Sequence, residues 1–312
     1  MSVRQVDQPP KLGRLYARAA VTARGRRGDR LPETEFALRD VVIDRNRLAS
    51  YAEVCGFRKS DVLPPTFPHV LAFPLAVTLM VDPSFPFAMP GLVHVGNRIS
   101  QQRPLRADER LTIGVRATDL RDHPRGRQFD MVTEVTVGGE PVWSEASTYL
   151  RRLRPPPLAG EGQGKPQIPS PLVGEGHGRP QIPSPLAGEG QGGGSHPTAI
   201  WRVPRDIGRR YAAVSGDVNP IHLNPLAARL FGFRRAIAHG MWLKARCLAA
   251  LEGRLPDNLT ATVEFKSPLL LPSTVAFFSA STDSGWAIAV SQAGTGRPHL
   301  TGTVQGNLAH SG

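Results

Sequence analysis

Cysteine is almost missing from this chain, which holds only Cys55 and Cys247 among its 312 residues. The two lie far apart in segments that read as helical, so a disulfide framework is not expected. A long apolar run is missing too, because Val70 to Val81 is too short to cross a bilayer and contains Pro74. The first thirty residues hold several arginines but lack the apolar core and cleavage site of a signal peptide. These absences predict a cytoplasmic protein without a membrane span.

Acidic residues are outnumbered, with 26 Asp and Glu against 38 Lys and Arg. An excess of this kind suits nucleic acid, an anionic membrane surface or a small molecule that carries several phosphates. The arginines are spread along the chain and are not clustered with aromatic residues, so we expect no nucleic-acid partner. Apolar residues make up 40% of the chain, which is enough to give two domains of ordinary size a core each.

Residues 157 to 194 are of low complexity. A 14-residue unit recurs there, starting at Leu158, Leu172 and Leu186, with Pro-Gln-Ile-Pro-Ser-Pro between the copies. Pro and Gly interrupt every candidate strand, which argues against a solenoid, and the few apolar residues cannot offset the entropy of ordering. We therefore predict a domain over residues 1–156, an unstructured linker over 157–197 that a flexible spacer could replace, and a second domain over 198–312.

The chain repeats itself weakly on either side of this linker. Tyr51-Ala-Glu-Val-Cys-Gly-Phe57 matches Tyr211-Ala-Ala-Val-Ser-Gly-Asp217. Arg103-Pro-Leu105 matches Ser267-Pro-Leu269, and the offsets of the two matches are nearly the same, 160 and 164 residues. Two copies of one domain is the economical interpretation.

Both copies predict helices followed by strands. Caps and terminating glycines place helices of the second copy over about 206–214, 224–232 and 240–251, and strands over 261–265, 274–280, 286–292 and 300–304. The first copy predicts helices over 44–54 and 70–80 and strands over 110–118, 130–137 and 143–150. This order is an α+β pattern in which an antiparallel sheet curls over a long helix.

The segment from Tyr211 to His222 carries the candidate chemistry. Pro220 forces Asn219 out of the helical region, so the chain bends and can bring Asp217 and His222 to one side. A carboxylate and an imidazole that face one water can exchange protons with it and with a neighbouring carbon. The alternative is that Asp217 and Asn219 only hydrogen-bond local backbone, as such turns often require. One Asp and one His fall short of the usual ligand count, so no metal is expected.

Gly240 opens the longest helix of the second copy. A glycine there leaves its backbone N–H accessible at the positive end of the helix dipole, where it can stabilise a carbonyl oxygen that gains negative charge. The alternative is that Gly240 only lets the helix start close to the sheet. The sequence alone does not choose between the two.

These residues resemble the MaoC-like or hydratase 2 family of the hot-dog fold. Its signature is matched in order and spacing by Tyr211, Ser215-Gly-Asp217, Asn219-Pro220, His222, Ala227 or Ala228, Gly232-Phe233 and Ile237-Ala-His-Gly-Met241. The first half, with Leu63-Pro-Pro-Thr-Phe-Pro-His-Val-Leu-Ala-Phe-Pro-Leu75 and Gly91-Leu-Val-His-Val95, looks like the degenerate leading domain of double-domain members. The resemblance implies two hot-dog domains, of which only the second keeps the motif.

The resemblance further implies a reversible hydration of a 2-enoyl thioester to a (3R)-hydroxyacyl thioester, without metal or other cofactor. Asp217 and His222 correspond to the catalytic pair and Gly240 to the oxyanion donor. Ser215, Asn219, His239 and Met241 are expected to position the substrate. In the first half Phe57 replaces the carboxylate and bulky residues open the helix, so that half, with Phe73, is expected to bind the acyl tail.

Two other functions stay open at this point, an acyl-CoA thioesterase of the same fold and a non-catalytic acyl-binding subunit. The partner is expected to be an acyl thioester of coenzyme A, whose phosphates suit the basic excess, or of an acyl carrier protein. A homodimer is a candidate assembly. The long Pro/Gly-rich linker departs from the family pattern.

Overall fold

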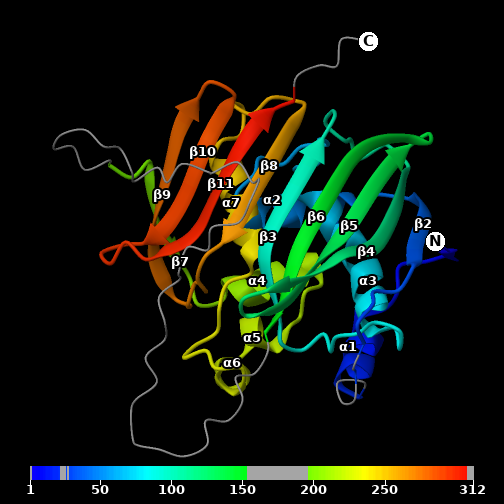
Figure 1. Ribbon diagram of the computed structural model, residues 1–312. Helices are drawn as coiled ribbons and strands as arrows, with labels where there is room; N and C mark the ends of the chain where they lie inside the picture. The colour runs from blue at the N-terminus through cyan, green and yellow to red at the C-terminus, as the bar shows by residue number, and fades with distance from the viewer. Residues whose placement is uncertain (1, 22–25, 27, 153–195, 308–312) are drawn as a thin grey trace, which may run out of the picture.

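In a computed structural model, which describes residues 2–21, 26, 28–152 and 196–307, one sheet of eleven strands runs across the molecule and lies in front of the helices in the view of Figure 1. Across the sheet the strands follow the order β1, β2, β4, β5, β6, β3, β8, β11, β10, β9, β7. All neighbours are antiparallel except β1 and β2. Their bounds are β1 Ser2–Val6, β2 Thr34–Val41, β3 Leu92–Gln101, β4 Leu111–His123, β5 Gly126–Val137, β6 Glu140–Arg152, β7 Ala199–Val203, β8 Leu259–Phe265, β9 Ser273–Thr282, β10 Gly285–Gln292 and β11 Pro298–Gly306.

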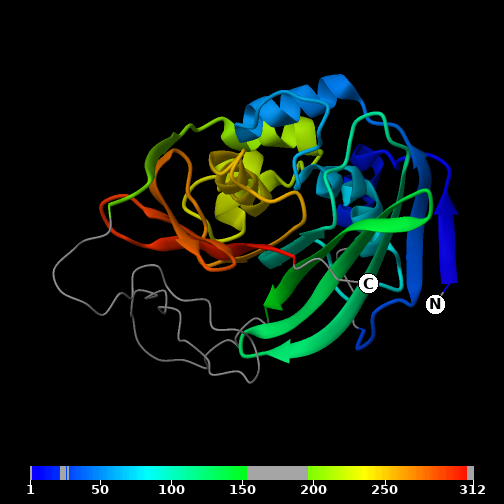
Figure 2. The same cartoon turned by 90° about the horizontal axis from the view of Figure 1, so that it is seen from above.

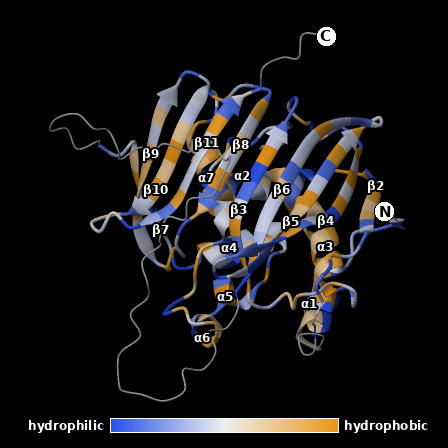
Figure 3. Ribbon diagram, in the orientation of Figure 1, coloured by the Kyte–Doolittle hydropathy of each residue, from blue (hydrophilic) through white to orange (hydrophobic). Residues whose placement is uncertain are grey.

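Helices line the concave face of this sheet. Seen from above, the strands of each half curve round helices (Figure 2), with α3 in the first half and α7 in the second. The helices are α1 Leu12–Val21, α2 Arg45–Cys55, α3 Phe67–Val81, α4 Ile207–Ser215, α5 Pro220–Leu223, α6 Pro225–Leu230 and α7 Gly240–Ala250. Apolar residues fill α3, and they alternate with polar ones along the strands (Figure 3), as elements covered on one or both faces require.

The two halves meet where β3 pairs with β8, from Gly96 opposite Glu264 to Gln101 opposite Leu259. We call this pairing the seam. One hydrophobic core runs under both sides of it, which makes the halves a single packed unit. Near the seam the matching helices α2 and α4 also pack together, with the rings of Tyr51 and Tyr211 6.1 Å apart. The two copies of the weak sequence repeat therefore form equivalent helices that contact each other.

A chain of polar side chains, buried except for the half-buried His69, crosses beneath the seam, and we call it the seam network. Lys244 of α7 donates to the side chain of Asn97 and, at 2.9 Å, to the carbonyl oxygen of Ala261. Asn97 in turn donates to Glu145 of β6, whose carboxylate lies 2.9 Å from Nδ1 of His69 on α3. Burial lowers the pKa of Lys244 to about 7, against the pull of Glu145. The network thus joins α7 of one half to α3 of the other.

Most elements expected from the sequence are present with small shifts of their ends. Gly56 and Gly216, at equivalent places in the two copies, both end their helices with φ of 85° and 82°, a conformation that favours glycine. Asp206 occupies the predicted cap position of α4 but makes no side-chain hydrogen bond there. The sequence pattern did not predict β1, α1, β2, β3, α5 or β7. The predicted linker falls almost wholly outside the described residues. None of the described helices is long and apolar enough to span a membrane.

Candidate active site

A sharp turn between α4 and α5 carries Asp217. Gly216 ends α4, and Asn219 then caps α5 by accepting a 3.4 Å hydrogen bond from the N–H of Ile221. Pro220 occupies the first position of α5, where its missing N–H costs nothing. The N–H of Asn219 donates to Oδ1 of Asp217 at 3.2 Å. A backbone N–H of the turn therefore helps to fix the position of the Asp217 carboxylate.

His222 sits two residues into α5 and is fixed by one hydrogen bond. Its Nδ1 lies 2.8 Å from the carbonyl oxygen of Ile237, in the strand-like segment before α7. A carbonyl oxygen can only accept, so Nδ1 carries the hydrogen and Nε2 keeps a lone pair. The neutral ring thus offers an acceptor to the site.

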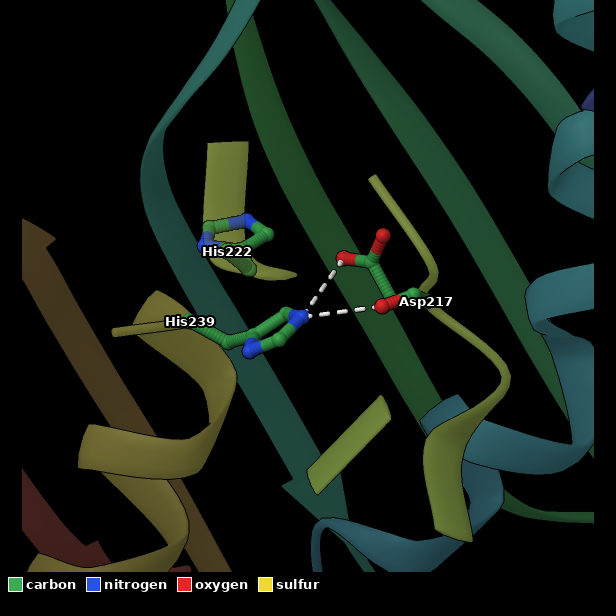
Figure 4. Close-up of side chains that lie close together, drawn as sticks. All are labelled: Asp217, His222 and His239. Atoms are coloured by element: carbon green, nitrogen blue, oxygen red, sulfur yellow. Dashed lines mark hydrogen bonds and ion pairs between the residues drawn. The ribbon is translucent and has the colours of Figure 1, made fainter. Parts of the chain in front are cut away.

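His239, the residue before α7, completes the group (Figure 4). Its ring stacks on that of His222 with 3.7 Å between centroids. Its Nε2 lies 3.0 Å from the carbonyl oxygen of Asp217 and 3.7 Å from Oδ2 of the same residue. Asp217, His222 and His239 can offer nitrogen and oxygen atoms that all lie within 4.8 Å of one another. The predicted juxtaposition of Asp217 and His222 is present, with His239 beside both.

The environment sets the charge of each group. Burial lowers the pKa of His222, and it lowers that of His239 to about 3, helped by the neighbouring ring of His222. For Asp217, burial favours the neutral acid, but the imidazoles of His239 and His222 and the hydrogen bonds to the carboxylate outweigh it, so its pKa lies below the usual value. At neutral pH the site therefore holds one carboxylate and two neutral imidazoles.

Gly240 starts α7 directly beside this group. The first N–H groups of a helix have no acceptor within the helix, so they are free to hold a ligand oxygen. A side chain on Gly240 would also collide with the ring of Phe265, whose nearest carbon atom would lie 2.9 Å from the added Cβ. Close packing on the sheet therefore requires glycine here, and this requirement is compatible with a role for the N–H.

The other residues predicted to bind substrate lie in different parts of the structure. Ser215 is buried, and its hydroxyl accepts a 3.1 Å hydrogen bond from the N–H of Asp217. Asn219 caps α5, as described above. Met241 is buried in the main core, in the first turn of α7. Phe73 lies on α3 and packs against a small cluster centred on Val77. Ser215 and Asn219 thus build the turn that carries Asp217.

A metal ion has to be considered, because the structure adds a third ligating side chain to the pair found in the sequence. The donor set of one carboxylate and two imidazoles is one that Zn²⁺ accepts. However, Nδ1 of His222 and Nε2 of His239 both face carbonyl oxygens and so act as N–H donors. The Nδ1 atom of His239 points away from Asp217 (Figure 4). The arrangement favours hydrogen bonding among these groups, and we assign no metal ligand.

One contact to the site was not predicted from the sequence. The hydroxyl of Tyr16, on α1, donates a 3.1 Å hydrogen bond to Oδ1 of Asp217. The two residues are separated by 201 positions, and Tyr16 lies in no motif. Only the apolar spacing of Leu12, Leu15 and Ala19 marks α1 as a helix with a packed face.

Comparison with known families matches both halves of the chain. The MaoC like domain covers residues 196–287, and the FAS1-like, dehydratase domain region covers residues 39–144. The 3-hydroxyacyl-thioester dehydratase X of Mycobacterium tuberculosis is 39% identical over 284 residues, which are 90% of this chain and 92% of that protein. The (R)-specific enoyl-CoA hydratase of Aeromonas caviae is 36% identical over 69 residues, 21% of this chain and 52% of that protein.

Solved structures agree with the fold. The crystal structure of HtdX from Mycobacterium tuberculosis superposes with a TM-score of 0.72 and 36% identity, covering 88% of this chain and all of that one. A MaoC-like dehydratase from Phytophthora capsici shares the fold with a TM-score of 0.64 at 18% identity, over 90% of this chain and 96% of that one. The expected α+β double hot-dog fold is confirmed.

The fold, the site and the matches together define a hydro-lyase. The chain belongs to the MaoC-like dehydratase family.

Proposed function

We propose that this enzyme catalyses the reversible hydration of a 2-enoyl thioester to a (3R)-hydroxyacyl thioester. The observation that carries the proposal is the meeting of Asp217, His222 and His239 within 4.8 Å at the N-terminus of α7. An ionised carboxylate and an imidazole lone pair side by side can hold and deprotonate one water. The adjacent helix N-terminus supplies the positive potential that an enolate oxygen needs.

The proton balance closes with a single water. Its oxygen adds to Cβ of the enoyl group, and the proton that it loses passes to Asp217 or His222. The electrons of the double bond move towards the thioester carbonyl, whose oxygen accepts a hydrogen bond from the N–H of Gly240. The stored proton then moves to Cα, which regenerates the site. Dehydration is the same sequence in reverse.

The choice of substrate rests on the relatives. The protein from Mycobacterium tuberculosis is named for a 3-hydroxyacyl thioester, and that from Aeromonas caviae for the (R)-specific hydration of an enoyl-CoA. The net charge of +12 suits the phosphates of coenzyme A, and it equally suits an acidic carrier protein. We therefore assign an acyl thioester with either carrier, and a homodimer stays a prediction.

The test is incubation with crotonyl-CoA, with two signals recorded separately. Loss of the absorbance of the conjugated double bond reports hydration, and release of free thiol reports thioester cleavage. We expect the first without the second, and chiral analysis of the product should give the (3R) isomer. Thiol release at the same rate as absorbance loss would make the protein a thioesterase, and neither signal with any chain length would make it an acyl-binding subunit.

The first prediction is that Asp217→Asn and His222→Ala each lower the hydration rate by about 10²–10⁴-fold, the usual effect of removing one proton-transfer group. Both residues are half-buried, in a turn and a short helix outside the hydrophobic core, so the fold should survive, as circular dichroism would verify. Asp206→Asn and His196→Ala are matched controls, because both are exposed and lie outside the site. Retention of more than about a tenth of the activity by either site variant would contradict the assignment.

A further inference from the structure

The helix α1 covers the candidate site although it lies outside both family-matched segments, which span residues 39–144 and 196–287. One end of α1 touches the reacting turn directly, because a side chain on Gly216 would lie 2.4 Å from Cδ1 of Leu12. Farther along, Leu15 and Ala19 pack with Val77 of α3. The helix thus bridges the turn that carries Asp217 and the long helix of the first half.

Tyr16 reaches from the middle of α1 to the carboxylate. Its hydroxyl and the N–H of Asn219 both donate to Oδ1 of Asp217, at 3.1 and 3.2 Å. The other oxygen, Oδ2, faces Nε2 of His239 at 3.7 Å. Two donors on Oδ1 fix the plane of the carboxylate and leave Oδ2 as the atom that can take a proton from water.

Tyr16 stays a donor throughout the working range of the enzyme. Burial raises the pKa of its hydroxyl far above the usual value, and the charge of Asp217 raises it further. A tyrosine that served only to pack α1 on the turn would need its ring and not its hydroxyl. The hydroxyl instead makes a charge-assisted hydrogen bond to the group proposed to react.

We propose that Tyr16 is a positioning residue of the active site, which orients the carboxylate of Asp217 and favours its ionised form. This inference rests on the proposed function. It makes α1 a part of the reacting centre and not only a cover for it.

The test is Tyr16→Phe, which removes the oxygen and keeps the ring. We expect kcat for crotonyl-CoA to fall by about tenfold, as loss of a hydrogen bond to a charged group implies, with KM changed by less than about twofold. The acid limb of the pH profile of kcat should move to higher pH, because Asp217 loses a bond that favours its ionised form. Other titratable groups also interact with this carboxylate. His222 of α5 and His239 before α7 face it, and its charge acts to raise the pKa values of His94 and Tyr149 in the first half.

Leu12→Ala is the matched control. It keeps the hydroxyl and weakens the packing of α1 on Gly216, so it reports what loosening the helix does. Trypsin cleavage after Arg14 measures the docking of α1 in each variant. We expect Tyr16→Phe to be cut at the wild-type rate, Leu12→Ala to be cut faster, and only Tyr16→Phe to shift the acid limb.

Two kinds of failure can be told apart. An inactive wild type, or an active Asp217→Asn, would contradict the proposed function itself. An active wild type with an inactive Asp217→Asn and a Tyr16→Phe whose kcat and pH profile match the wild type would contradict only the role of Tyr16. Loss of activity in Tyr16→Phe without a shift of the acid limb would likewise reduce Tyr16 to packing.

Discussion

At the scale of single residues, the polar side chains of the turn from Ser215 to His222 stabilise the turn as well as form part of the candidate site. Ser215 and Asn219 satisfy backbone N–H groups, and Asp217 accepts from backbone as well. The interpretation that these side chains hydrogen-bond local backbone is therefore correct for the structure of the turn. It does not exclude a catalytic role for Asp217, because a rigid turn is what a reacting carboxylate needs to stay in place.

Activity should persist in mildly acid solution. The pKa values of Asp217 and His222 are both below their usual values, so both groups are in their basic forms above those values and lose them as the pH falls. The acid limb of kcat/KM for hydration should therefore lie below about pH 6.5, the ordinary pKa of histidine. A pH series on wild type and Asp206→Asn measures it, and a limb above that pH would show that the site is not desolvated as described.

Much of this residue-scale arrangement could be predicted, because it is local. Pro220 dictates the bend, and the bend brings Asp217 and His222 together over five positions. Gly240 could be placed at the start of a helix because this prediction, too, depends only on neighbouring residues. The contact between Tyr16 and Asp217 could not be predicted, since it depends on how α1 packs across 201 positions of sequence.

At the scale of elements, α3 and α7 occupy equivalent places but begin differently. Gly240 opens α7, with His239 before it, whereas α3 opens with Phe67 and Pro68 after Thr66. Both helices could be predicted from their apolar content, and the end of α7 also from Gly253 and Pro256 just beyond it. The strands β1 and β7 could not, because both are edge strands of only five residues. The residues of β1 are almost all exposed, and β7, although its burial alternates, is too short for a period of two to stand out in the sequence.

Phe73 tests whether the first half binds the acyl tail. Its half-buried ring lies on α3, next to His69 at 6.2 Å. Phe73→Ala should change the preference for acyl length, because an apolar pocket discriminates by about 1–3 kcal/mol per methylene. Turnover of a four-carbon substrate should stay within a few-fold. The measurement is kcat/KM over a series of enoyl-CoA chain lengths.

Val77→Ala is a control for loosened packing, because Val77 belongs to the same cluster but is almost fully buried. If Phe73→Ala abolished turnover of the short substrate in a protein that still folds, α3 would have to be counted within the reacting centre. A length profile unchanged from wild type would place the tail elsewhere.

At the scale of the whole molecule, the seam network joins the two halves through charged groups. The carboxylate of Glu145 is 2% exposed and is held by His69 and Asn97. Although burial acts to raise it, the pKa of Glu145 is lowered by His69, by hydrogen bonds and by Lys244. A buried ion of this kind costs little while all of its partners are present and much when one is removed.

Glu145→Gln should therefore destabilise the fold by about 3 kcal/mol at pH 6, since it leaves Lys244 buried without its counter-charge. The sign with pH follows from the lowered pKa of Glu145: its contribution is complete above the unfolded value near 4.5 and fades as the pH falls through the folded one. The difference between wild type and variant, from urea unfolding, should stay constant from pH 6 down to about pH 4.5 and shrink as the pH falls further.

Glu134→Gln on the neighbouring strand is the matched control. Its partner is Arg116 and its side chain is 48% exposed, so the change should cost less than about 1 kcal/mol. Equal effects of the two substitutions would show that the seam network contributes no more than a surface ion pair.

The seam also has a consequence for dilution. A strand pair shared by two separate chains dissociates when the protein is diluted, by mass action. Here β3 and β8 belong to one chain, so the effective concentration at which they pair does not depend on the protein concentration. Dilution therefore cannot separate the half that carries Asp217 from the half that carries Phe73.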